Sequence, residues 1–204
     1  MKISETTRHT TLHIKKAIGG LILVLALAEV LLVFTSWLLS AMMVEGVRSM
    51  LSSEGIRWFF GSFSTMMSTP WLFSLLLLAM AGGCLWRSRL LTRPRSYRER
   101  ASLRTILILL VLYIAIVAAL AVAPHAILLS ATGRLLPSPF SRAFFPILSF
   151  GVLIISAVYG MLTGRFNSLT AVLDALYYGI AQSAPLFVLY IVAAQFYYSL
   201  TFVF

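Results

Sequence analysis

Long apolar stretches alternate with short polar ones along the whole chain. Five of these stretches are long and apolar enough to cross a bilayer as helices. The spans are expected at about residues 17–43, 71–86, 103–124, 144–162 and 184–204. Hydrophobic residues make up 60% of the chain and charged residues 11%, whereas a soluble domain is about half apolar and a quarter charged. The sequence therefore predicts an all-α integral membrane protein with a single transmembrane domain over residues 1–204, surrounded by the lipid bilayer.

The segment LSSEGIRWFF at residues 51–60 predicts a short helix after the first span. Ser52 or Ser53 is a suitable N-cap for this helix. Trp58, Phe59 and the neighbouring Arg57 are typical of a helix that lies in the bilayer interface. The alternative interpretation is an ordinary loop that packs on the protein.

Two of the apolar stretches have a second interpretation. The first follows a Lys-Lys pair and contains Ala-Leu-Ala at residues 26–28, which also suits a cleaved signal peptide. Its apolar character continues past Glu29 to Leu39, and this length favours a membrane span. The last stretch contains Pro185 and is either a full span or a re-entrant segment.

Basic residues are distributed unequally between the two sides of a five-span arrangement. Four precede the first span, seven lie within residues 87–104 and Arg165 follows the fourth span, which places twelve of the 16 on one side. The positive-inside rule then predicts a cytoplasmic N-terminus. The same distribution accounts for the net charge of +10 without a nucleic-acid partner.

The sequence carries no recognisable enzyme motif. It has no HExxH zinc motif, no GxSxG nucleophile elbow and no phosphate-binding loop. Cys84 is the only cysteine, and three histidines without a further ligand nearby do not predict a metal site. We therefore expect no catalytic residue, no metal and no cofactor.

Glu29 lies near the middle of the first span. A charged residue at that depth costs about 2.5–3.5 kcal/mol on insertion scales, so it must face protein or water, or be protonated. One interpretation is a carboxylate that couples transport to an ion or proton, or that contacts a substrate. The other is a polar link to another helix through Gln182 or Gln195. All three residues are candidates for a substrate or ion pathway.

Small residues at helical spacing predict close helix contacts at two places. Ala115, Ala119 and Ala123 repeat every four residues in the third span. Gly160 and Gly164 form a similar pair at the end of the fourth span.

Several short motifs resemble the AbgT family of p-aminobenzoyl-glutamate transporters. They occur in the family's order: TGRLLPSPF at 132–140, Pro-Ile at 146–147, Val-Tyr-Gly at 158–160 with Gly164, a polar turn ending near Val172, and AAQF at 193–196. A weaker match covers residues 51–58 and the following span through Gly83. Among the pathway candidates, only Gln195 falls within a matched motif.

The resemblance implies an ion-coupled secondary transporter in the inner (cytoplasmic) membrane of a bacterium, and a dimer. Family members have additional helices and a polar re-entrant hairpin where this chain has only a short arginine-rich linker between Gly83 and Arg100, and a second hairpin after the segment that AAQF matches. The resemblance is therefore to a shortened member without the polar hairpins. Two hypotheses follow: a compact transporter of organic anions that works as a homo-oligomer, or a scaffold that binds another membrane protein and does not transport.

The charge distribution makes a direct prediction about topology. A cysteine introduced as Arg95→Cys should react with a membrane-impermeant maleimide only from the cytoplasmic side, because it lies in the arginine-rich linker. Arg134→Cys provides the control and should react only from the opposite side. Labelling of position 95 from outside would reverse the predicted topology.

Overall fold

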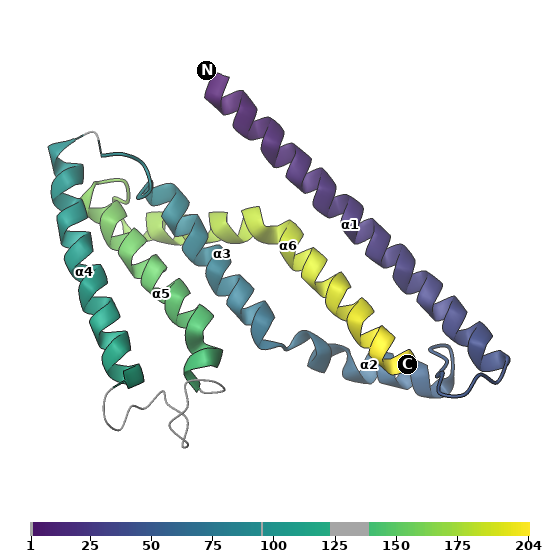
Figure 1. Cartoon of the computed structure of the whole chain (residues 1–204). Helices are drawn as coiled ribbons and strands as arrows, with labels where there is room; N and C mark the ends of the chain where they lie inside the picture. The colour runs from purple at the N-terminus through teal and green to yellow at the C-terminus, as the bar shows by residue number, and fades with distance from the viewer. Residues whose placement is uncertain (1, 95, 123–138) are drawn as a thin grey trace. The chain divides into compact units, whose positions relative to one another are not determined.

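Helices make up most of the part of the chain that its computed structural model describes (Figure 1). The backbone is described for residues 2–94, 96–122 and 139–204, and the side chains for residues 13–94, 96–120 and 143–204. The helices in these ranges are α1 (Lys2–Ala41), α2 (Ser53–Met67), α3 (Pro70–Ser88), α4 (Tyr97–Val122), α5 (Pro139–Leu162) and α6 (Leu169–Val203). The predicted fold class is confirmed: all-α, with five long apolar helices and one short helix after the first span.

Among the residues that the structure describes, five segments are long and apolar enough to cross a membrane. They are His13–Ala41 in α1, Pro70–Ser88, Tyr97–Leu120, Ala143–Leu162 and Leu169–Val203. In α1 and in α4, only 6% of the most apolar 18-residue stretch is buried within the protein. Large side chains such as Leu31 and Ile108 are therefore exposed along these two helices. Apolar surface on all sides of a helix requires an apolar solvent. These helices therefore form a multi-pass membrane protein.

The last helix is longer than the apolar stretch predicted at 184–204. α6 begins at Leu169 and continues through Pro185, and its 35 residues correspond to a length of about 52 Å. Leucine and alanine favour helix formation in residues 169–183, and proline is tolerated within membrane helices. About 20 apolar residues are enough to cross the hydrocarbon core, so α6 is longer than a single span requires.

The chain packs as two compact units. The first unit consists of Met1–Leu72 and Ala184–Phe204, and the second of Phe73–Ser183. α1, α2 and the C-terminal part of α6 belong to the first unit. Nearly all of α3, together with α4, α5 and the N-terminal part of α6, belongs to the second.

In the first unit, α2 runs antiparallel to the end of α6. Trp58, near the start of α2, stacks on Phe202, with ring centroids 4.3 Å apart. Thr69, which follows α2, shares a hydrogen bond with the hydroxyl of Tyr190, about three turns earlier in α6. Leu32 of α1 and Met50 join Phe202 in the apolar core at this end of the unit.

The local sequence explains where α2 begins and ends. The Ser52 side chain accepts a hydrogen bond from the Gly55 N–H at 3.1 Å, which confirms one of the two predicted N-caps. The helix ends before Ser68, and Pro70 begins α3 at the first helical position, where proline fits without loss of a hydrogen bond.

α2 has two apolar faces. One face, which includes Gly55, Trp58 and Met66, is buried or half-buried within the first unit. Ile56, Phe60 and Phe63 are exposed, at a spacing that places them together on another face. An apolar exposed face on a short helix suits contact with lipid.

In the second unit, α4 packs against α5. Ile106 of α4 lies in a buried cluster with Ile155 and Tyr159 of α5. Further along the pair, the Tyr113 hydroxyl donates a hydrogen bond to the Ile147 carbonyl at 2.6 Å. The Arg98 Nε donates to the Leu162 carbonyl at 2.8 Å and so satisfies one of the terminal carbonyls of α5.

α3 and α6 approach closely within the second unit. A Cβ atom at Gly83 would overlap the backbone of Ala175 and Gly179, and one at Gly179 would overlap the Ala79 carbonyl and Gly83. Each helix thus contributes two small residues four positions apart, the arrangement that lets membrane helices touch through their backbones.

The close approach of α3 and α6 predicts different effects at two neighbouring glycines. Gly83→Ala should lower the free energy of unfolding by roughly 1–3 kcal/mol, because helix backbones cannot shift as easily as side chains. Gly82→Ala is the control, since a Cβ atom there meets nothing within 4 Å. The free energy is measured by SDS titration in mixed micelles. Equal stability of the two variants would contradict the contact.

Candidate functional site

A polar cluster joins α1 to α6 inside the first unit. The Ser199 hydroxyl donates a hydrogen bond of 2.5 Å to Oε1 of Glu29. The Gln195 side-chain amide, one turn earlier in α6, donates to the Ser199 hydroxyl at 3.2 Å. Two of the pathway candidates predicted from the sequence, Glu29 and Gln195, are therefore linked through a serine that the sequence analysis did not identify.

Helical spacing explains how the cluster is positioned. Gln195, Ser199 and Phe202 occur at intervals of four and three residues and share one side of α6. On α1, Leu32 packs in the same core as Phe202, and Glu29 lies one turn before it. The apolar core that Leu32 and Phe202 share thus brings the carboxyl group of Glu29 to Ser199.

Ser199 differs from most of the other buried serines in what it bonds. Ser88, Ser102 and Ser149 are buried, and each donates its hydroxyl to a carbonyl of its own helix. Such serines behave as small residues that need no partner on another helix. Ser199 is fully buried and donates instead to a carboxyl group on α1. A serine that follows a glutamine by four residues in an apolar helix is the only sequence signal that points to this role.

Two oxygen atoms of the cluster have no hydrogen-bond partner among the described residues. They are Oε2 of Glu29 and Oε1 of Gln195, and both atoms are buried. A buried polar atom without a partner costs roughly 1–3 kcal/mol, and the cost is high in the hydrocarbon region of a membrane. The cluster therefore has capacity to accept a proton or a positively charged group.

The third pathway candidate lies in the second unit. Gln182 is exposed, and its amide nitrogen donates to the hydroxyl of Tyr178, one turn earlier, at 3.0 Å. This contact is local to α6. The involvement of Gln182 in a pathway stays a prediction.

The predicted small-residue contacts have different surroundings. Ala115 and Ala119 have exposed side chains, and Ala123 lies outside the described residues. Gly160 contacts the ring of Phe166, and Gly164 has a positive φ of 73° in the turn after α5. The glycine pair thus shapes the end of α5, where the carbonyl of Gly160 accepts hydrogen bonds from Arg165 and Phe166.

The charged groups of the described residues give no sign of a metal centre. No group of three or more histidine, cysteine, aspartate or glutamate side chains comes together in the ranges that the structure describes. The arginines and lysines there lie toward the ends of the spans or outside them. Glu29 is therefore the charged group at mid-depth in these spans.

Comparisons with known proteins do not assign a family. A scan of the chain against protein-family models finds no match, and searches of curated proteins and of solved structures find none that match. The resemblance to the AbgT family stays an interpretation of the short motifs.

The hydrogen bond between Ser199 and Glu29 predicts a stability difference between two buried serines. Ser199→Ala should lower the free energy of unfolding by roughly 1–3 kcal/mol, because it leaves the second oxygen of Glu29 unpaired as well. Ser156→Ala is the control, since Ser156 is equally buried and its hydroxyl has no partner in the described structure. SDS titration of both variants measures the difference, and an equal loss in both would contradict the role of Ser199.

Proposed function

We propose that the chain is a secondary transporter of AbgT-like type in a bacterial inner membrane. It carries p-aminobenzoyl-glutamate or related organic anions and couples their movement to protons. The observation that supports this most is the partly buried cluster of Glu29, Ser199 and Gln195 within membrane-spanning helices. Ionisable groups at membrane depth are costly, and they mark ion and proton pathways.

A proton is the coupling ion that the cluster suits best. The two unpaired oxygens are one carboxylate oxygen and one amide oxygen. Metal cations such as Ca²⁺ take six to eight oxygen ligands, and Mg²⁺ takes six, whereas a proton needs a single basic atom. Glu29 alternates between a protonated and an ionised state as the coupled anion moves. Ser199 holds the carboxyl group in place by donating its hydrogen bond to Oε1.

A non-transporting scaffold is the second candidate function. An organic dianion needs cationic or helix-terminus donors where it is bound. The described arginines and lysines lie toward the span ends or outside the spans. This distribution favours a membrane subunit that binds another membrane protein. The exposed side chains of Ala115 and Ala119 would suit a close helix contact with such a partner, or with a second copy of the chain.

Flux through the purified chain separates the two functions. In proteoliposomes, an imposed proton gradient should drive accumulation of radiolabelled p-aminobenzoyl-glutamate. Glu29→Gln should reduce this accumulation to the level of empty liposomes, because the amide cannot exchange a proton at neutral pH. Glu45→Gln is the matched control, because Glu45 is exposed in the segment after α1 and should leave transport unchanged.

Two results would contradict proton coupling by Glu29. Gradient-driven accumulation that persists in Glu29→Gln would remove this residue from the mechanism. The absence of flux in the correctly folded wild-type chain would favour the scaffold.

A further inference from the structure

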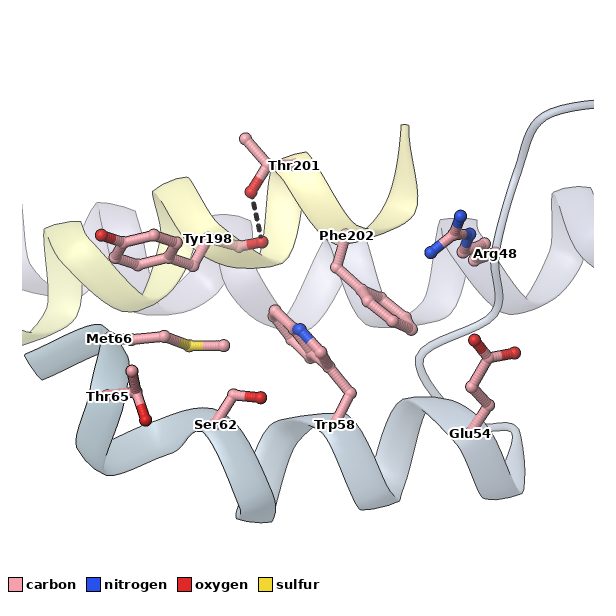
Figure 2. Close-up of a pocket in the computed structure, with 9 residues that line it drawn as sticks. All are labelled: Arg48, Glu54, Trp58, Ser62, Thr65, Met66, Tyr198, Thr201 and Phe202. Carbon is pink, nitrogen blue, oxygen red and sulfur yellow. Dashed lines mark hydrogen bonds between the residues drawn. The ribbon is translucent and has the colours of Figure 1, made fainter.

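A groove of about 520 Å³ lies between α2 and the last turns of α6, in the first unit (Figure 2). Its walls come from three segments: the connection after α1, which carries Arg48, the face of α2 and the end of α6. Figure 2 shows Arg48 and Glu54 at one end of the groove and Tyr198 and Met66 at the other. The polar cluster at Glu29 contributes no residue to this lining.

The two charged residues at one end of the groove have opposite signs. The Arg48 guanidinium lies over the ring of Phe202, 5.9 Å from its centroid. The Arg48 backbone is fixed by a hydrogen bond of 3.0 Å from its N–H to the Val203 carbonyl. Glu54 is in the first turn of α2. In the part of the chain that the structure describes, neither residue forms an ion pair, so both remain able to bind charges of a ligand.

The rest of the groove is aromatic and apolar with a few hydroxyl groups. The stacked rings of Trp58 and Phe202 form its centre, and Met66 lies further along. Ser62 and Thr65 of α2 add hydroxyls to the same wall. The groove thus pairs a dipolar end with a wall suited to a hydrocarbon chain and an ester linkage.

Lipid has direct access to this part of the molecule. The exposed face of α2 carries Ile56, Phe60 and Phe63, whose exposed fractions are 49%, 77% and 41%. Apolar side chains exposed to this extent in a membrane protein face the bilayer. The groove lies on another face of α2, and it opens at Glu54, Thr65 and Thr201, whose side chains are exposed. A membrane lipid beside α2 can therefore place its headgroup at Arg48 and Glu54.

We propose that this groove binds a phosphatidylethanolamine molecule. The lipid phosphate binds the Arg48 guanidinium, a planar donor that suits phosphate oxygens. The primary ammonium group of the headgroup donates hydrogen bonds to the Glu54 carboxylate, and an acyl chain packs along Trp58 and Met66. A phosphatidylcholine headgroup has no N–H to donate, and phosphatidylglycerol has no cation for Glu54, so the groove discriminates against both.

Native mass spectrometry of the detergent-solubilised chain tests this selectivity. The wild-type chain should retain phosphatidylethanolamine in preference to phosphatidylcholine and phosphatidylglycerol of the same acyl composition. Arg48→Gln and Glu54→Gln should each weaken that retention by about tenfold, as expected when a hydrogen bond between charged groups is lost. Arg57→Gln is the matched control, since Arg57 is an exposed charge on α2 that does not line the groove, and it should retain the lipid like the wild type.

A fluorescence measurement keeps the proposal testable if a charge variant misfolds. The triple variant Trp37→Phe, Trp71→Phe and Trp86→Phe leaves Trp58 as the single tryptophan. Brominated phosphatidylethanolamine should quench the fluorescence of Trp58 more strongly than brominated phosphatidylcholine at the same mole fraction.

Several results would overturn the proposal. One is equal quenching of Trp58 by the two brominated lipids. Another is unchanged retention of phosphatidylethanolamine in both Arg48→Gln and Glu54→Gln. A third is a loss of retention in Arg57→Gln as large as in those two variants. Displacement of the lipid by free phosphoethanolamine at the lipid's own concentration would also overturn it, because it would show that the acyl chain contributes nothing. None of these measurements depends on transport.

Discussion

The hydrocarbon core supplies no hydrogen bonds, so polar groups within the spans must find partners in the protein. α1 and α4 are largely exposed apolar helices, which require apolar surroundings. Within that environment, a carboxyl group at Glu29 is tolerated where another helix provides a donor. Ser199 is that donor, and the packing of α1 against the end of α6 therefore depends on a polar contact as well as on the apolar core around Leu32 and Phe202.

The end of α6 contacts two different parts of the first unit. Ser199 faces α1 and holds Glu29, whereas Tyr198 and Phe202 line the groove beside α2. Phe202 also belongs to the core with Leu32 and Met50. The Arg48 guanidinium lies over its ring in a cation–π contact. The last turns of this helix thus connect the buried carboxyl group of the proposed coupling site to the proposed lipid site.

Hydropathy alone predicted the fold class, because a span of about 20 apolar residues is a strong and local signal. The short helix at Ser53–Met67 was also predictable, since its serine cap and aromatic residues lie next to each other in the sequence. The contact between Gly83 and Gly179 was not, because it depends on which two of several small-residue pairs meet in space. For the same reason, the pair Gly160 and Gly164 suggested a helix contact, whereas Gly160 contacts the ring of Phe166 and Gly164 lies in the turn after α5.

The candidate site was predictable only in part. Glu29 is easy to find in the sequence, because a glutamate in the middle of an apolar span has a high free-energy cost of membrane insertion. Its partner Ser199 does not stand out, because serines are common in membrane helices and most of the buried ones bond to their own backbone. The choice among Gln182, Gln195 and Ser199 depends on how α1 packs against α6, which hydropathy does not specify. The start of α6 at Leu169 was not predicted, because the expected span at 184–204 covers only the C-terminal part of this helix.

The most direct measurement of the central claim is infrared difference spectroscopy of the chain in lipid bilayers as the pH is stepped. A proton site at Glu29 predicts a carbonyl band of a protonated carboxyl group that rises and falls reversibly with pH. The band should be missing from Glu29→Gln and shifted in Ser199→Ala, where the hydrogen bond to the carboxyl group is lost. A difference spectrum that is the same in the wild type and in Glu29→Gln would contradict the proposal that Glu29 exchanges the coupled proton.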